Sequence, residues 1–399
     1  MTVPAVRLSD PEVYEQGVPH DYFDHLRRES PIHWHEEEPP GRGFWAITRY
    51  ADVVAVSRDA ETFSSFVGTT SLNDYDEDVR TKQQAMMINH DPPRHTRQRN
   101  LVSRGFTPRV IDRLEPHIRD ICDSLVAGVE KSGEVDFVHD IAAQLPLAVI
   151  AELMGAPGED REKLYDWSNQ MIGHEDPEFR DAAERAAAEI FLYANAMAED
   201  RRSCPREDIV TRMIAPDASG DVLSEMEFNM FFVLLVVAGN ETTRNAASGG
   251  MLTFLENPDQ WRKLKQHPEL TASAVEEILR WVTPVMDFRR TALRDTRIGD
   301  QPISAGDKVV LFYPSANRDE AVFAQPHRFD IERDPNPHIT FGGGGPHFCL
   351  GAYLARLELR VLFETLARRL PDIELVGPVR RLRSNFINGI KEMPVRLHA

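Results

Sequence analysis

Apolar residues recur every three or four positions over most of this chain, which is the spacing of one face of an α-helix. The pattern is clearest in three segments, at residues 108–131, 181–202 and 350–370. Strand-like runs are fewer and shorter, and they stand at residues 31–36, 43–50, 287–295, 307–317 and 394–399. We therefore expect a mainly helical fold with a minor β region in which the short strands pair.

The segment from residue 223 to residue 258 predicts a single long helix. Ser224 stands three positions before Glu227, the spacing of a capping box, and Pro258 follows the last apolar residues. The middle of the segment is apolar on all sides, which is typical of a helix buried through the centre of a protein. Into that centre the sequence AGNETT inserts a glycine, a carboxylic acid and two hydroxyl groups. A buried carboxylate is costly, so it indicates a function or a charged partner.

Composition and charge narrow the possible functions. The 399 residues carry a formal net charge of −18, which argues against a nucleic-acid partner. The first residues lack the basic stretch and apolar core of a signal peptide, and we expect no transmembrane segment. Three cysteines without C-x-x-C spacing indicate neither a disulfide framework nor a structural zinc site. No linker or repeat interrupts the chain, so we expect one large domain over residues 1–399, located in the cytoplasm.

Two short patterns carry candidate chemistry. Four consecutive glycines precede Cys349 in FGGGGPHFCLG, and such a run indicates a sharply bent backbone or the close approach of a bulky group. Glu277 and Arg280 stand three positions apart on a predicted helix and can pair on one face. Taken alone, a lone cysteine is most often buried and inert, and such an ion pair most often lies on the surface with little effect on stability.

In combination, these segments resemble the cytochrome P450 family of haem-thiolate monooxygenases over the full length of the chain. The resemblance rests on E-x-x-R at 277–280, HRFD at 327–330, the glycine-rich loop ending in H-x-C-x-G, and A-G-x-E-T in the long helix. It implies a haem b cofactor with Cys349 as the axial ligand of its iron. It also implies a buried structural ion network of Glu277, Arg280 and Arg328.

The resemblance places Phe341 and Gly351, at the two ends of the glycine-rich loop, beside the haem. Backbone amides around the Cys349 sulfur are expected to stabilise its thiolate form. Phe341 stands eight positions before Cys349 where the commonest form of the loop has seven. The extra glycine leaves open whether Phe341 packs against the sulfur.

The two haem propionates need paired donors when they are buried. By resemblance, His95 and Arg99 match the pattern D-P-P-x-H-x-x-x-R, and Arg290 and His347 match the remaining ligands. Arg289 is the alternative to Arg290. The sequence leaves that choice open.

Oxygen activation in this family needs protons at the site while bulk water stays out. Glu241 and Thr242 look like the family's acid–alcohol pair, one turn after Ala238 and Gly239. The Thr242 hydroxyl is expected to bond to the Ala238 carbonyl, and Gly239 to leave room for O2 against the iron. We expect Arg244 to form a salt bridge with Glu241. We expect the Thr243 hydroxyl to donate a hydrogen bond to the backbone carbonyl four positions earlier.

The substrate pocket carries no motif, so its residues are predicted from position alone. The apolar candidates are Met86, Met87, Val285, Met286, Phe386 and Ile387. Each is more often plain core, but together they favour a hydrophobic small-molecule substrate. A weaker resemblance to soluble bacterial hydroxylases of methyl-branched lipids and sterol side chains points the same way, with terpenoids and polyketides left open.

Electrons are expected from a ferredoxin and its ferredoxin reductase, because the sequence holds no flavin, NAD or iron–sulfur motif. A local basic patch for docking has five candidates, Arg104, Arg109, Arg113, Arg356 and Arg360. Two other functions stay open, a peroxide-driven peroxygenase and a non-catalytic haem-binding sensor. A peroxygenase typically lacks the acid–alcohol pair and carries a polar anchor for a fatty-acid carboxylate, and a sensor has no use for the pair.

Overall fold

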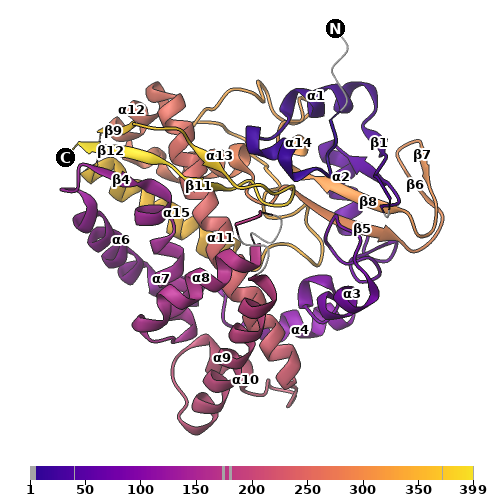
Figure 1. The fold of residues 1–399 in the computed structure, drawn as a ribbon, viewed down its shortest axis with the longest axis horizontal. Coiled ribbons are helices and arrows are strands. Elements are labelled where there is room, and N and C mark those ends of the chain that lie inside the picture. The colour runs from indigo at the N-terminus through magenta and orange to yellow at the C-terminus, as the bar shows by residue number, and fades with distance from the viewer. Residues whose placement is uncertain (1–5, 40, 173–175, 179–181, 371, 399) are drawn as a thin grey trace.

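The computed structural model describes residues 6–39, 41–172, 176–178, 182–370 and 372–398. The ends of two expected elements, residues 181 and 399, lie outside the described residues. Within these ranges the fold is mainly helical with a minor β region, as predicted (Figure 1). Most helices gather on one side of the molecule, and the principal sheet lies on the other side with α1, α2 and α14. None of the described helices combines the length and the apolarity that a membrane span requires.

The helices begin and end close to where the sequence signals stand. Asp76 caps the first turn of α3, and Gly155 ends α7 with a φ of 70°. The helices are α1 (His20–Glu29), α2 (Tyr50–Arg58), α3 (Glu77–Gln83), α4 (Arg94–Ser103), α5 (Pro108–Ile111), α6 (Glu115–Val129), α7 (Gln144–Met154), α8 (Arg161–Ile172), α9 (Ala183–Ser203), α10 (Ile209–Ile214), α11 (Glu225–Glu256), α12 (Pro258–Gln266), α13 (Thr271–Val282), α14 (Tyr313–Ala316) and α15 (Ala352–Arg369).

The principal sheet has the strand order β1-β2-β8-β5-β3, in which β2 and β8 are parallel and the other pairs antiparallel. Its strands are β1 (Ile32–His35), β2 (Phe44–Ile47), β3 (Phe63–Ser64), β5 (Asp287–Ala292) and β8 (Lys308–Phe312). The smaller sheets contain β4 (Glu134–Asp136), β6 (Thr296–Ile298), β7 (Gln301–Ile303), β9 (Asp372–Leu375), β10 (Arg380–Arg381), β11 (Ile390–Glu392) and β12 (Pro394–His398).

The expected strands all pair, and they do so in two separate sheets. The runs at 31–36, 43–50, 287–295 and 307–317 do pair in the principal sheet, but β12 pairs with β4 and β9 in a separate sheet. The reason lies in the chain path: β9 follows α15 directly, so the C-terminal strands lie on the helical side of the molecule (Figure 1).

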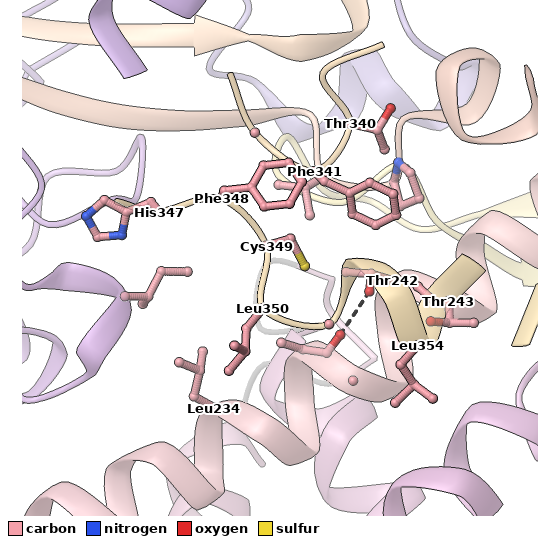
Figure 2. Close-up of a pocket in the computed structure, with 18 of the residues that line it drawn as sticks. Leu234, Thr242, Thr243, Thr340, Phe341, His347, Phe348, Cys349, Leu350 and Leu354 are labelled. Atoms are coloured by element: carbon pink, nitrogen blue, oxygen red, sulfur yellow. Dashed lines mark hydrogen bonds between the residues drawn. The ribbon is translucent and has the colours of Figure 1, made fainter. Parts of the chain in front are cut away.

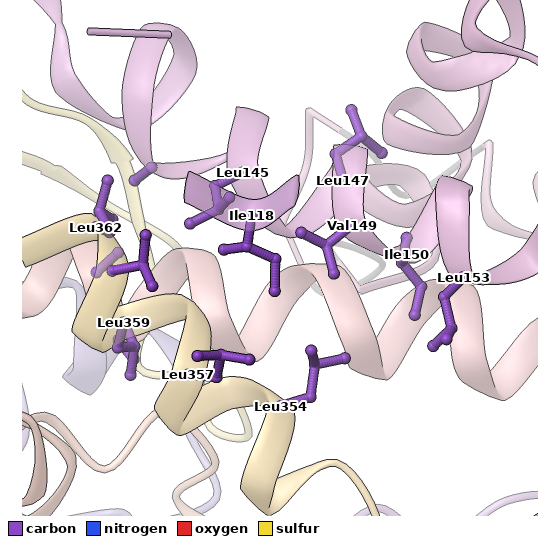
Figure 3. Close-up of a cluster of buried hydrophobic side chains, with 14 of the residues drawn as sticks. Ile118, Leu145, Leu147, Val149, Ile150, Leu153, Leu354, Leu357, Leu359 and Leu362 are labelled. Atoms are coloured by element: carbon purple, nitrogen blue, oxygen red, sulfur yellow. The ribbon is translucent and has the colours of Figure 1, made fainter. Parts of the chain in front are cut away.

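The long helix α11 runs through the centre of the molecule, as its apolar pattern predicts (Figure 1). Both hydrogen bonds of the expected capping box between Ser224 and Glu227 are present. Figure 3 shows the core beside it, where Ile118 of α6 and Val149 of α7 meet Leu357 of α15. Burial of these side chains stabilises the fold and fixes the position of α15. Because α15 begins directly after the cysteine loop, the core also positions Cys349.

The buried ion network forms, but with a different third member. Glu277 and Arg280 are fully buried, and two guanidinium nitrogens of Arg280 donate to the carboxylate at 2.8 and 2.7 Å. Arg333 Nε donates to the same carboxylate at 3.0 and 3.2 Å. The expectation for Arg328 is wrong, because its side chain is 59% exposed. The turn at residues 330–333, held by the Asp330 amide on Glu277, directs Arg333 inward and leaves Arg328 outside.

We expect Arg333→Ala to lower the free energy of unfolding by about 3 kcal/mol, because loss of a buried partner leaves the Glu277 carboxylate partly uncompensated. Arg328→Ala removes an exposed side chain and is expected to change it by less than about 0.5 kcal/mol. Urea unfolding of the two variants beside the wild type measures both effects. Equal losses would mean that the exposed Arg328 contributes as much as Arg333.

Candidate active site

A large cavity lies between α11 and the loop that precedes α15 (Figure 2). It holds about 1540 Å³ of space between protein atoms, its opening to solvent included. A pocket for one small ligand usually measures roughly 300–1,000 Å³. The cavity therefore has room for a large cofactor and a second molecule beside it.

Cys349 lies in the wall of this cavity. Figure 2 shows its sulfur pointing from the loop toward α11. The side chain is exposed to the cavity but surrounded by protein, and this burial raises the pKa of the thiol. The backbone amides of Gly351 and Ala352 and the guanidinium of Arg99 act in the opposite direction. The expected amide donors around the sulfur are therefore present, and a metal cation would complete the stabilisation of a thiolate.

The end of α2 packs directly against the loop, and this close contact requires glycine at two of its positions. A Cβ atom on Gly345, whose φ is 77°, would lie 2.4 Å from the Ser57 carbonyl oxygen. A Cβ atom on Gly343 would lie 2.7 Å from the Ser57 hydroxyl. Phe341 nevertheless lines the cavity, and the Arg356 guanidinium lies 4.4 Å above its ring. The carbonyl of Phe341 accepts the Cys349 amide at 2.9 Å.

The four expected propionate ligands all line the cavity: His95 and Arg99 from α4, Arg290 from β5, and His347 from the cysteine loop. The rings of His95 and His347 lie 4.2 Å apart between centroids. Arg289 points away from the cavity and bonds to Asp74 at 2.7 Å. Alternation along β5 thus decides between the two arginines, and it places Arg290 at the site.

The two histidines and two arginines that line the cavity form a cluster that lacks negative charge. Burial and the neighbouring arginines lower the pKa of His95 to about 4 and that of His347 to about 2. His95 Nδ1 is buried without a hydrogen-bond partner among the described residues. None of the four donors forms a salt bridge with a carboxylate of the described chain, and donors gathered in this way fit a dianionic ligand. The two carboxylates of a haem meet that requirement.

The polar residues of α11 divide between two sides of the helix. Thr242 lines the cavity, and its hydroxyl donates to the Ala238 carbonyl at 2.9 Å, as expected. Glu241 is fully buried on the side that faces α8, where its carboxylate bonds to Arg244, the expected partner. Burial raises the pKa of Glu241, and Arg244 opposes that shift. The lack of a side chain on Gly239 has a structural reason as well, since a Cβ atom there would lie 2.8 Å from Ile150 of α7.

Two of the six expected substrate residues line the cavity, Met87 and Val285. The expectation is wrong for Met86, Met286, Phe386 and Ile387, which lie outside the lining. Val285 pairs with Ile387 in a β-bridge, and the Met286 amide donates to the Phe386 carbonyl at 2.9 Å. Neighbouring side chains along an extended chain point to opposite sides. Because Val285 faces the cavity, Met286 faces the core.

Several residues that line the cavity carry no signal that was used to predict them. The apolar ones include Ile88, Phe231, Leu234, Leu235 and Phe288. Helical spacing back from Ala238 would have found the three on α11, because residues three, four and seven positions apart share a face. Glu358 of α15 also lines the cavity, and burial raises its pKa to about 8. The Thr243 hydroxyl opposes this shift in the pKa of Glu358.

Comparison with known proteins agrees with this geometry. The family model for cytochrome P450 matches residues 11–371. A steroid C26-monooxygenase of Rhodococcus jostii is 47% identical over 97% of this chain and 84% of its own length. A methyl-branched lipid omega-hydroxylase of Mycobacterium bovis is 44% identical over 94% of this chain and 90% of its own. A cytochrome P450 of Mycobacterium marinum, solved in complex with pseudoionone, superposes with a TM-score of 0.91 at 37% identity, covering 99% of both chains.

The site and these comparisons define a haem enzyme that activates O2. The chain belongs to the cytochrome P450 family. It is an oxidoreductase, a monooxygenase that binds haem b, uses O2 and acts on a hydrophobic substrate. The fold and family expectations from the sequence are thereby confirmed.

We expect Gly345→Ala to destabilise the protein by roughly 1–3 kcal/mol, because the residue would be strained at its positive φ and its Cβ would meet the Ser57 carbonyl. Gly158→Ala is the matched control, since nothing lies within 4 Å of a Cβ atom there. Thermal unfolding of both variants measures the difference. A Gly345→Ala variant as stable as the control would contradict the close packing of α2 on the loop.

Proposed function

We propose that this monooxygenase hydroxylates the side chain of a sterol or of a methyl-branched lipid, with electrons from a ferredoxin. The observation that carries the proposal is the arrangement of the cavity. The Cys349 sulfur and the hydroxyl-bearing face of α11 lie on facing sides, and apolar side chains form the remaining wall next to α11 (Figure 2).

The residues of the cavity have the donor set that haem needs. In this proposal the Cys349 thiolate would bind the haem iron. His95, Arg99, Arg290 and His347 hold the two carboxylates, which supply the negative charge that this donor cluster lacks. When bound, the haem supplies O2 activation and the insertion of one oxygen atom into a C–H bond, a reaction that thiolate donation favours.

We assign Thr242 and Glu241 to proton handling. The Thr242 hydroxyl faces the cavity and holds a proton beside the place of reaction. Glu241 stands beside Thr242 in the helix but faces α8, where Arg244 and Ser168 donate to its carboxylate and Arg244 also donates to Asn169. The apolar wall of Phe231, Leu234 and Leu235 limits water near these groups.

The residues that line the cavity favour a substrate bound by apolar contacts. They do not favour a fatty acid that is anchored through its carboxylate. Outside the four proposed propionate ligands, the described lining residues include no lysine, arginine or histidine. That composition disfavours the peroxygenase alternative, which anchors a carboxylate. The two most similar relatives described above act on steroids and on methyl-branched lipids, as their names state. A sensor needs neither the roomy apolar wall nor the Thr242 hydroxyl.

The proposed ferredoxin docks on a narrower set of arginines than the sequence indicated. Arg356 forms a two-nitrogen ion pair with Glu276, and Arg360 pairs with Glu115 and Glu364. Arg104 donates to two backbone carbonyls. Exposed side chains at Arg109 and Arg113 are left to attract an acidic carrier. We place this electron transfer in the cytoplasm, where free thiols such as Cys204 and Cys349 stay reduced.

Cys349→Ala is expected to abolish the strongly red-shifted Soret band that reduction under carbon monoxide gives with thiolate ligation. Thr242→Ala is the control inside the same cavity. It should keep the band, because the cysteine ligand is unchanged. It should also lose more electrons as peroxide, because a hydroxyl that holds a proton is gone. Difference spectra and peroxide assays separate the two roles. A Cys349→Ala protein that retained the band would overturn the ligand assignment.

Sterols with branched side chains and methyl-branched lipids are expected to shift the haem spectrum by displacing iron-bound water. Val285→Phe overfills the lining and should weaken this binding by about tenfold, since overpacking costs roughly 1–3 kcal/mol. Met286→Leu, one position along but outside the lining, should stay within about twofold. Spectral titrations measure the dissociation constants. A response confined to small polar compounds would exclude the lipid substrates.

The double variant Arg109→Glu/Arg113→Glu is expected to slow reduction by ferredoxin about tenfold at low ionic strength, and less at high salt where charges are screened. Peroxide-driven turnover needs no carrier and should stay unchanged. Arg28→Glu/Arg297→Glu, an equal charge change in α1 and β6, is the control. Stopped-flow reduction measures the rates. Equal slowing by both double variants would place the docking surface elsewhere.

A further inference from the structure

One corner of the cavity holds a tyrosine for which the sequence indicated no role. Tyr313 directly follows β8 and begins α14, and it lines the cavity although it is only 3% exposed. Its amide donates to the Met286 carbonyl at 3.0 Å, so its place is fixed beside β5. Its ring packs edge to face on Phe288, with 6.1 Å between centroids. The ring is thus held rigidly, with its hydroxyl in a polar corner.

That corner contains a buried cation that forms no salt bridge with the described residues. Arg290 is 4% exposed, and it exerts the largest charge effect on the Tyr313 phenol. Its Nη1 donates to the Arg289 carbonyl at 2.7 Å, but no carboxylate of the described chain lies within salt-bridge distance of it. The nearby Asp91 carboxylate accepts two other hydrogen bonds. The Ser64 hydroxyl donates to it at 2.5 Å and the Ser65 amide donates to it at 2.7 Å.

A buried guanidinium without a directly bonded anion is unfavourable. A carboxylate supplies the missing charge and accepts several hydrogen bonds at once. We propose that the Tyr313 hydroxyl donates a hydrogen bond to the haem carboxylate that Arg290 holds, which makes Tyr313 a cofactor-binding residue. This inference rests on the proposed function, in which the cavity binds haem.

A phenol suits this position because it donates without adding charge. Arg290 already lowers the pKa of His347, so a further cation would increase the repulsion in the cluster. Burial raises the pKa of Tyr313, which keeps the phenol protonated and able to donate. The competing explanation is a closed pair with the Ser57 hydroxyl, which lies within hydrogen-bonding reach and donates its own proton to the Val53 carbonyl at 2.7 Å.

The test is the rate at which excess apomyoglobin removes haem from the holoprotein. Tyr313→Phe keeps the ring packing and loses only the hydroxyl. It should release haem about tenfold faster, the ratio that corresponds to about 1.4 kcal/mol for a hydrogen bond to a charged group. Tyr193→Phe is the matched control, because its hydroxyl bonds to Asp160 at 3.0 Å outside the cavity lining. Its release rate should equal that of the wild type.

Ser57→Ala separates the two explanations. Under the proposal it accelerates haem release far less than Tyr313→Phe does, whereas a closed pair predicts equal effects. Infrared spectra of haem labelled with ¹³C in its propionates give a second readout. The carboxylate stretch should shift in Tyr313→Phe and in neither Ser57→Ala nor Tyr193→Phe.

Each outcome has one meaning. An unchanged carboxylate band together with wild-type release from Tyr313→Phe would overturn the role of Tyr313 while leaving the haem site intact. Equal release from Tyr313→Phe and Ser57→Ala would also overturn it, in favour of the closed pair. A wild-type protein that takes up no haem, seen as a missing Soret band, would instead overturn the proposed function.

Discussion

The position of the cysteine loop depends on one buried carboxylate. Glu277 accepts hydrogen bonds from Arg280, Arg333, Asn336 and the Asp330 amide, so four groups from two distant segments meet on it. This ties residues 330–336 to α13, a few residues before the glycine-rich loop begins. The cost of burying the charge is offset only while every partner stays in place. Cys349 can therefore face α11 because Glu277 holds the segment that precedes it.

The cavity is defined as much by unsatisfied groups as by empty space. Apolar side chains of α11 form one part of its wall, and the nitrogen-bearing side chains from α4, β5 and the cysteine loop form another. In the protein alone, these donors depress one another's pKa and leave His95 Nδ1 without a partner. An anion would offset these effects, and a haem brings two carboxylates to the cluster. The holoprotein is expected to be more stable than the protein without its cofactor.

The sequence predicted the elements that depend on local patterns. Helix α11 with its capping box, the bond from Thr242 to Ala238, and the pair of Glu241 and Arg244 all follow from spacing along one helix. The errors concern residues whose place depends on the path of a turn or on the direction of a side chain in extended chain. Arg328 and Met286 are such cases. Tyr313 was missed because nothing in its neighbourhood along the chain indicates that β5 brings Arg290 beside it.

The contact between α2 and the glycine-rich loop joins two parts of the chain that are nearly three hundred residues apart. Ser57 and Arg58 occupy the space that side chains at Gly343, Gly344 and Gly345 would otherwise fill. Neither segment can change its length or its bulk alone, because the other already occupies that space. A side chain added at any of these three glycines would therefore have to displace the end of α2. The first and last thirds of the chain thus share one boundary, and a change in bulk on one side of it requires a movement on the other.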